Sequence, residues 1–335
     1  MTARPAGRRI IRATVVTVVG AVILAATVAC GTTHSPLPTD AEPLPPATAA
    51  AVLAGTTTAP TQGCGNPRAS LVPPDPMPAP GDMPAGSFMK TIQDRGYLVV
   101  GVIPDVPPFG IVNPQTNQLE GFDVDMAKEM AAAIFGPGNP KIRFRAITNA
   151  ERIPAVQHGL IDIAIATMTI TCDRRRDVDF SAVYYDSGQR VLVRRDSGFR
   201  RIEDLAGRKV CAAARTTSIQ AIATVSPAPI PYPVTNVADC LVALQQGVVD
   251  GISTDDGILT GIVDQDPYTM IVGPRFTDEP HGMAVNKDHP DFTRFLNGAL
   301  ETIEKNGRWT EIYRRWLTGP GTEPVPAPPV PEYQG

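Results

Sequence analysis

The amino-acid sequence predicts an α/β fold in which a parallel β-sheet is covered by helices. Apolar, strand-like runs alternate with segments of helical periodicity between residues 97 and 170, and a second alternation of the same kind begins near residue 201. Strands that alternate with helices are joined by crossover connections, which is the arrangement of a parallel sheet. Proline-rich segments lie on both sides of this regular part, which starts near residue 87.

The first alternation predicts three strands and two helices. In order, the segments are a strand at 97–105, a helix at 123–136, a strand at 141–148, a helix at 149–160 and a strand at 161–170. Two of the strands are continuous apolar runs, which is typical of strands buried on both faces. Asp123 is the expected N-cap of the longer helix, and Gly136 marks its end.

The second alternation is longer and ends in two helices. In order, it contains a turn and strand at 201–214, a helix start at 216–225, a helix at 236–249, a strand leading into a helix at 250–259, strands at 270–276 and 281–287, and two helices within 289–317. The apolar residues of the closing helices recur at helical spacing, so core packing explains them. The same interpretation holds for Trp309 and Trp316.

The N-terminal segment resembles a targeting signal. A basic stretch at 4–12 precedes an apolar run at 13–29, which ends in small residues directly before Cys30. This layout predicts a lipoprotein signal peptide at 1–29 with lipid attached to Cys30. The alternative is an uncleaved membrane anchor in which Cys30 has no role. Either interpretation places the rest of the chain outside the cytoplasmic membrane, in an extracytoplasmic location.

Residues 30–86 are rich in Pro, Thr, Ala and Gly and poor in aromatic side chains. Such a segment buries too little apolar surface to offset the entropy lost on ordering, so it predicts an extended tether. Residues 319–335 have a similar composition and predict a flexible tail.

Composition and charge exclude several classes of function. The chain of 335 residues has a formal net charge of −4 and 19% charged residues, with no basic stripe that would indicate nucleic-acid binding. The cysteines and histidines lack the spacing of a zinc site, so we expect no metal and no cofactor.

The cysteine count predicts disulfides. If Cys30 carries lipid, four cysteines remain outside the cytoplasm, and an even number there suggests two bridges. Three pairings are possible. We favour Cys211 with Cys240, because their elements should be neighbours, and this leaves Cys64 with Cys172 to attach the tether to the folded part.

Six sequence blocks in this order resemble the extracytoplasmic solute-binding proteins for polar amino acids, the capture subunits of ATP-driven importers. The blocks are residues 98–110, 119–131, 153–185, 202–218, 243–256 and 306–317. The resemblance implies the type II periplasmic-binding-protein fold, with two α/β lobes and a ligand cleft between them. It implies a first lobe at 88–194 plus 276–318 and a second lobe at 195–275. The strands that cross between the lobes would be 191–197 and 271–277.

The resemblance also implies which residues of the first lobe hold the ligand. Arg174 matches the family arginine that clamps the α-carboxylate of an amino acid. Thr169 and the backbone near Ala166 and Thr167 match the neighbouring donor positions. Arg175 and Arg176 follow directly, and a solvated helix face is the better interpretation for both.

In the second lobe, Thr216 and Thr217 match a turn that offers N–H and hydroxyl groups to the same carboxylate. A plain helix cap is the alternative, and both roles are compatible. Arg215 stands where the family usually has glycine, which puts the geometry of this turn in doubt. Asp255 aligns with the acid that receives the α-ammonium, and Asp256 more simply caps the next helix.

Specificity depends on the cleft's remaining side chains. Phe109 either packs over the ligand or belongs to the core. Arg152 matches a position where binders of acidic amino acids carry arginine toward the distal carboxylate; the alternative is that Glu151 pairs with it and neutralises it. A cation often present near the end of the first strand is replaced by Ile103. The sequence therefore favours Asp or Glu as ligand, with Asn or Gln tolerated.

The resemblance implies a monomeric, lipid-anchored binding protein without catalytic activity that delivers an amino acid to a membrane permease after hinge closure. A sensor that presents its liganded form to a signalling membrane protein is the first alternative. The second is an enzyme of the same fold, a dehydratase or a lytic wall enzyme. Such an enzyme needs a general acid in the cleft, for which Glu120 and Asp105 are the only obvious candidates near the first loops.

Overall fold

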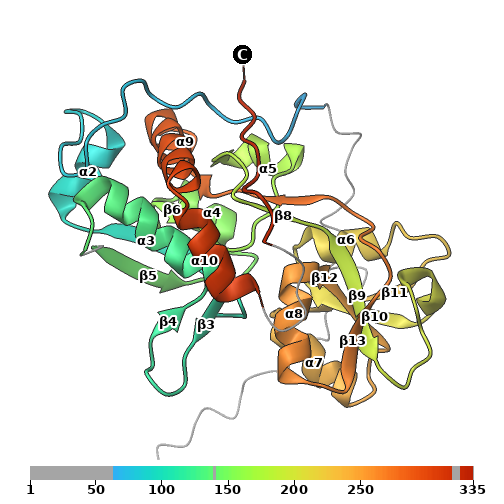
Figure 1. Cartoon of the computed structure of the whole chain (residues 1–335). Coiled ribbons are helices and arrows are strands. Elements are labelled where there is room, and N and C mark those ends of the chain that lie inside the picture. The colour runs from blue at the N-terminus through green and yellow to red at the C-terminus, as the bar shows by residue number, and fades with distance from the viewer. Residues whose placement is uncertain (1–62, 139–140, 319–324, 335) are drawn as a thin grey trace, which may run out of the picture. The chain divides into compact units, whose positions relative to one another are not determined.

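The computed structural model describes residues 63–138, 141–318 and 325–334 (Figure 1). The predicted signal peptide, Cys30 and the tether up to residue 62 lie outside the described residues. Within the described ranges, no helix combines the length and apolarity needed to cross a membrane.

A five-stranded mixed sheet forms the centre of the first lobe. Its strand order is β5 (Ile142–Ala146), β1 (Leu98–Val102), β6 (Ile163–Ala164), β15 (Ala284–Val285) and β7 (Asp179–Phe180). β1 runs parallel to β5 and β6, as the first alternation predicts, whereas β15 pairs antiparallel with β6 and β7. The late strand β15 therefore returns the chain to the first sheet after the second lobe is complete.

The described part of the first lobe contains six helices. They are α2 (Phe88–Arg95), α3 (Phe122–Phe135), α4 (Arg152–Gln157), α5 (Cys172–Asp177), α9 (Pro290–Lys305) and α10 (Arg308–Leu317). Figure 1 shows α3, α9 and α10 packed together in front of the sheet. Trp309 is buried and its indole donates to the Tyr184 carbonyl at 2.8 Å, in agreement with a core role.

The N-cap predicted for α3 is wrong. The N-cap is Gly121, two residues before Asp123, and it has a φ of 139°. A Cβ at Gly121 would lie 2.2 Å from the Phe109 carbonyl oxygen, so only glycine fits there. Asp123 is thereby moved into the first turn of the helix, where its side chain is buried.

The second lobe has its own five-stranded sheet. The strand order is β11 (Ile230–Val234), β10 (Lys209–Ala213), β12 (Gly251–Asp255), β9 (Gln189–Arg194) and β13 (Thr269–Val272). Its helices are the 3-10 helix η2 (Ile202–Leu205), α6 (Thr217–Ile222), α7 (Val237–Gln245) and α8 (Asp256–Gln265). The sequence did not predict β11, because Pro231 and Pro233 interrupt it. β11 lies at the sheet edge, where proline is tolerated.

The first crossing between the lobes lies before the predicted residues 191–197, whereas the second, around Arg275, overlaps the predicted residues 271–277. β9 was assigned to the first lobe (88–194), but it lies inside the second sheet, between β12 and β13. β8 (Tyr185–Ser187) comes directly before β9, and β14 (Glu279–His281) comes after β13. These two strands pair antiparallel with each other. A Cβ at Gly188 would meet the Arg275 side chain at 2.4 Å, so the two crossing segments approach closely there. A small sheet of β2 (Asp105–Val106), β3 (Gly110–Val112) and β4 (Leu119–Glu120) completes the strands described.

The two Pro-rich ends of the described chain pair with each other. We call residues 63–72 the strap and residues 325–334 the tail. Ser70 donates its N–H to the Glu332 carbonyl and accepts from the Gln334 N–H, both at 2.8 Å, in a parallel bridge to Tyr333. Tyr333 also donates its hydroxyl to Glu301 at 2.7 Å. The prediction of a flexible tail is therefore wrong for 325–334, since these contacts hold it against α9.

Arg68 connects the strap to the crossing segments. Its guanidinium lies 2.6 Å from Asp186 in β8, 3.3 Å from Asp278 before β14 and 3.1 Å from Glu332 in the tail. The tether prediction therefore fails for the strap, because these ion pairs and the disulfide described next attach it to the first lobe.

The structure contains both of the favoured disulfides, Cys64–Cys172 and Cys211–Cys240. They close loops of different length, with sequence separations of 108 and 29 residues. The longer loop restricts the unfolded chain more strongly, so loss of Cys64–Cys172 should cost about 5 kcal/mol and loss of Cys211–Cys240 about 3.5 kcal/mol as upper values. Urea unfolding of the two paired Cys→Ser variants measures this; free thiols in the unmodified, denatured domain would contradict both bridges.

Candidate functional site

A small cavity lies at the carboxyl-terminal ends of strands from both sheets and is lined by residues of both lobes. Three of its lining side chains are charged: Arg152, Arg174 and Asp255. Six carry hydroxyl groups: Thr167, Thr169, Thr216, Thr217, Ser218 and Thr254. Parallel strands place their following loops at one edge of a sheet, which is why these residues converge.

Arg174 is positioned by the short helix α5. The Thr171 hydroxyl caps this helix and accepts from the Arg174 N–H at 3.2 Å. The Arg174 guanidinium is half-buried and donates through Nη1 to the Thr169 carbonyl at 2.6 Å. Burial lowers the pKa of this guanidinium, while the charges of Glu279 and Asp255 raise it. The residue predicted to clamp a carboxylate therefore does line the cavity.

The next two arginines have different surroundings. Arg176 is 64% exposed and pairs with Asp173 at 3.0 Å, as expected of a solvated helix face. Arg175 is not solvated in this way, because its Nε donates to the Pro67 carbonyl of the strap at 2.7 Å. The surface prediction holds for Arg176 and is wrong for Arg175.

Arg152 is 2% exposed and makes no ion pair among the described residues. Its Nη1 donates to the carbonyls of Ala166 and Thr167 at 3.0 and 3.3 Å, and its Nε to the Asn149 carbonyl at 3.3 Å. Burial, together with the charge of Arg174, lowers the pKa of Arg152 to about 9, so it stays charged at neutral pH.

The alternative in which Glu151 neutralises Arg152 is not what the structure contains. Glu151 is exposed, and its carboxylate accepts from the Thr148 N–H at 2.8 Å and the Thr148 hydroxyl at 2.9 Å. These two bonds lower the pKa of Glu151. Glu151 therefore does not neutralise Arg152.

Asp123 fixes the backbone at the end of β6. Its carboxylate is buried, accepts from the Thr167 N–H at 2.9 Å and accepts from the Tyr184 hydroxyl at 2.9 Å. Thr167 has a φ of 45°, and Asp123 holds this turn in place. The Thr167 backbone therefore does not offer the predicted N–H donor to a ligand, whereas the donor expected near Ala166 stays a prediction. The Thr167 N–H is already bonded, and both residues instead present carbonyls to Arg152.

Burial raises the pKa of Asp123 to about 6, although Tyr184, Thr167 and nearby charges lower it. A carboxyl whose pKa is higher in the folded than in the unfolded state stabilises the fold below pH about 4, and this contribution is lost as the pH rises to about 6. At about 1.4 kcal/mol per unit, the loss is roughly 3 kcal/mol. Asp123→Asn should remove this decline in urea-unfolding experiments between pH 4 and 7; an unchanged slope would contradict the assignment.

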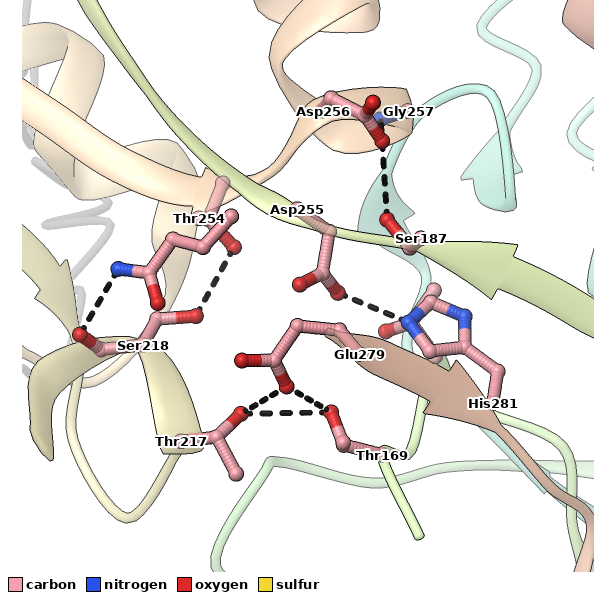
Figure 2. Close-up of polar contacts among 12 residues, drawn as sticks. Thr169, Ser187, Thr217, Ser218, Thr254, Asp255, Asp256, Gly257, Glu279 and His281 are labelled. Carbon is pink, nitrogen blue, oxygen red and sulfur yellow. Dashed lines mark hydrogen bonds and ion pairs between the residues drawn. The ribbon is translucent and has the colours of Figure 1, made fainter. Parts of the chain in front are cut away.

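Glu279, on the crossing strand β14, joins threonines from the two lobes (Figure 2). Its Oε2 accepts from the hydroxyls of Thr169 at 2.7 Å and Thr217 at 2.8 Å, and these two oxygens lie 3.3 Å apart. A hydroxyl has one proton to donate. In this arrangement both threonines therefore present lone pairs, rather than donors, to the cavity through their side chains.

Thr216 serves as a helix cap, which was the alternative to ligand binding. Its hydroxyl accepts from the Ile219 N–H at 3.2 Å and donates to the Ala213 carbonyl at 2.6 Å. Arg215 is exposed and adopts a φ of 58°, so the turn keeps the left-handed backbone that glycine usually supplies.

Asp255 and Asp256 point in different directions (Figure 2). Asp255 is 4% exposed and lines the cavity; its Oδ2 lies 2.9 Å from Nε2 of His281, and its Oδ1 has no hydrogen-bond partner among the described residues. Asp256 instead accepts from Ser187 at 3.0 Å and pairs with Arg275 at 2.6 Å. Asp256 is the first residue of α8 and Asp255 the N-cap, but the Asp256 side chain accepts from the first-turn N–H of Gly257 at 2.9 Å, so the predicted contact with the helix start is present.

The remaining predicted residues lie outside the cavity. Phe109 is 1% exposed and packs edge-on against Phe122 and Tyr185, so the core interpretation holds and Val106 lines the cavity instead. Neither Glu120 nor Asp105 lines it. Glu120 accepts from Asn113 at 2.7 Å, and burial raises the pKa of Asp105.

No group of three or more His, Cys, Asp or Glu side chains able to hold a metal ion occurs in the part of the chain that the structure describes.

A comparison with protein families matches residues 98–319 to the bacterial extracellular solute-binding proteins, family 3. The chain belongs to this family. The ABC transporter glutamine-binding protein of Bacillus subtilis is 39% identical to this solute-binding protein over 230 residues, which cover 68% of this chain and 84% of that protein. The glutamate-binding protein of Corynebacterium glutamicum is 31% identical over 243 residues, covering 69% and 82%.

Solved structures resemble the solute-binding protein over a similar range. An ancestral arginine-binding protein bound to glutamine has a TM-score of 0.61 and 35% identity, and the match covers 67% of this chain and 98% of that one. The two-lobed type II periplasmic binding fold is thereby confirmed.

Three polar residues of this solute-binding protein were missed by the reasoning from sequence: Asp123, Glu279 and His281. Asp123 was interpreted as a helix cap. Glu279 and His281 stand two residues apart, so in a strand they face the same side. That spacing beside the predicted strand at 281–287 was the available signal.

Proposed function

We propose that this solute-binding protein captures an acidic amino acid, aspartate or glutamate, in the cavity between its lobes. One observation carries the proposal: the charged side chains that line the cavity are two arginines and one aspartate. An acidic amino acid has two carboxylates and one ammonium, which is the complementary set. A neutral zwitterion brings only one carboxylate, so it would place no ligand charge opposite Arg152, which makes no ion pair among the described residues.

Each ligand group has a partner in this proposal. Arg174 clamps the α-carboxylate, because α5 holds its guanidinium at the cavity beside Thr169. Asp255 receives the α-ammonium through Oδ1, its unpartnered oxygen. Arg152 reaches the distal carboxylate with Nη2, since its Nε and Nη1 are bonded to carbonyls. Charge-assisted bonds of this kind are the stronger class of hydrogen bond.

Asparagine and glutamine remain acceptable ligands in this scheme. The amide oxygen of either can accept from Arg152, although it offers no negative charge. The relatives support both classes, because one is named for glutamine and another for glutamate. The difference in affinity between acidic and amide amino acids therefore depends mainly on how strongly the charge of Arg152 interacts with the ligand's side chain.

We place the protein outside the cytoplasmic membrane, attached by lipid at Cys30, where its closed form would deliver the amino acid to an ABC-type permease. The Bacillus subtilis relative is named as part of such a transporter. Delivery to a signalling membrane protein is the alternative use of the same closed form. A genetic deletion that abolishes uptake of the ligand would favour the permease.

The proposal excludes chemical conversion of the ligand. A dehydratase or lytic enzyme needs a general acid in the cavity besides the zwitterion partners. Asp255 is the one carboxylate among the lining residues, and its proposed role is to bind the ammonium.

Calorimetric titration of the purified domain against the twenty amino acids tests the function. We expect the tightest binding for glutamate or aspartate and weaker binding for glutamine and asparagine. Tight binding of a basic or apolar amino acid, or no binding of any, would overturn the proposal.

A further inference from the structure

We propose that His281 is a positioning residue that aims the ammonium-binding carboxylate of Asp255 into the cavity. This inference rests on the proposed function, because it assigns a role in holding the ligand's α-amino group. It concerns a residue that does not itself line the cavity.

The contact between the two side chains is a buried hydrogen bond. His281 is 0% exposed and Asp255 4% exposed, and Nε2 lies 2.9 Å from Oδ2 (Figure 2). A carboxylate only accepts, so Nε2 carries the proton and donates it. With Oδ2 held in this way, the carboxylate can rotate little, and Oδ1 remains for the cavity.

His281 is the donor on which Oδ2 depends. No other hydrogen bond to the Asp255 side chain occurs among the described residues, and Oδ1 is buried without a partner. Buried polar atoms in folded proteins nearly always have a partner, so an orphaned carboxylate oxygen at a cavity indicates a cationic or donor ligand group. The orphan Oδ1 and its anchored neighbour Oδ2 together form one half of an ammonium site.

The ring of His281 is itself held firmly. It lies among the rings of Phe109, Tyr184 and Tyr185, at centroid distances of 6.0, 6.2 and 5.4 Å. Its Nδ1 has no hydrogen-bond partner in the described part of the chain. The histidine is therefore placed by packing on its sides and by a single polar bond at Nε2.

The backbone of His281 connects this bond to the first lobe. His281 forms a bridge with Thr169, and its carbonyl accepts from the Tyr184 N–H at 3.0 Å. Asp255, in contrast, ends β12 of the second sheet. A residue of the crossing strand thus orients a carboxylate of the second lobe toward the Thr169 and Arg174 side of the cavity. The ammonium and carboxylate partners of one ligand are aligned by this contact.

The test compares two variants in which an amide side chain of different length replaces His281. His281→Gln keeps an N–H₂ donor near the position of Nε2, whereas the shorter His281→Asn has the same chemistry but cannot reach Oδ2. Each is titrated with glutamate and with glutarate, which has both carboxylates and lacks the ammonium. We expect the affinity ratio of glutamate to glutarate to fall about tenfold or more in His281→Asn and to stay within about threefold of the unmodified protein in His281→Gln.

Two results would overturn the inference: a glutamate-to-glutarate ratio that stays unchanged in His281→Asn, as it does when both ligands lose affinity equally, or a fall of the same size in His281→Gln. Thermal unfolding of each variant identifies any loss of fold. If His281→Asn does not fold, His281→Phe, which suits the aromatic surroundings and lacks the donor, replaces it under the same expectation. Absence of amino-acid binding in the unmodified protein would instead refute the proposed function, so the two failures are distinguishable.

Discussion

Replacing Arg174 by alanine should abolish measurable binding of every amino acid, whatever its side chain. The α-carboxylate is common to all of them, and Arg174 is its proposed partner at the cavity. A charge-assisted hydrogen bond contributes about 1.5–3 kcal/mol, so loss of a two-bond clamp should lower the affinity by at least about a hundredfold. Calorimetry of the variant against the best ligand of the unmodified protein measures the effect.

The neighbouring arginines supply matched controls. Arg176→Ala removes an exposed side chain whose one ion pair among the described residues is with Asp173, so the affinity for the amino acid should be unchanged. Arg175→Ala removes the bond to Pro67 of the strap and should lower stability more than affinity. Retained binding in Arg174→Ala, or a loss of the same size in Arg176→Ala, would reject the clamp.

Replacing Arg152 should change the selectivity of the site rather than abolish binding. Arg152→Ala is expected to weaken aspartate and glutamate about tenfold or more beyond its effect on asparagine and glutamine, because only the acids lose a charge pair. The substitution also leaves the carbonyls of Asn149, Ala166 and Thr167 without their donor. Arg152→Gln keeps an N–H₂ group and separates the loss of charge from this loss of donors.

Selectivity is measured as the ratio of glutamate to glutamine affinity in each variant. Glu151→Ala is the control, because Glu151 bonds to Thr148 and not to Arg152, and the ratio should not move. Equal weakening of acids and amides in both Arg152 variants would show that this arginine only supports the fold.

Much of the fold follows from local sequence patterns, and its exceptions have physical reasons. β1 and the helices and strands that follow it in the first lobe could be predicted, because the buried side chains of each element give it an apolar pattern of its own. β11 is hidden by its two prolines, which an edge strand tolerates. β9 looks like the continuation of the first lobe because it follows β8 directly, and its sheet is decided by pairing with β12 and β13.

The candidate site also has a part that could be predicted from sequence and a part that could not. Arg174, Arg152 and Asp255 could be placed because each follows a predicted strand, where ligands of α/β sheets gather. The partners of these residues could not, because they are distant in the chain. Glu279 lies 110 residues from Thr169 and His281 lies 26 residues from Asp255. Which way a hydroxyl or a carboxylate points depends on such contacts, so the donor role expected of Thr169 and Thr217 could not be checked from sequence.

The pairing of Ser70 with Tyr333 has a practical consequence for measuring ligand capture. Both ends of the described domain meet on the first lobe, so two fluorescent reporters fused to the ends would sit together and record little of a hinge motion. A reporter inserted in the second lobe, for example at the exposed residues 226–228 before β11, would move relative to one fused at the end. The same pairing makes a circular permutation with joined ends and a new opening at those residues a natural sensor design.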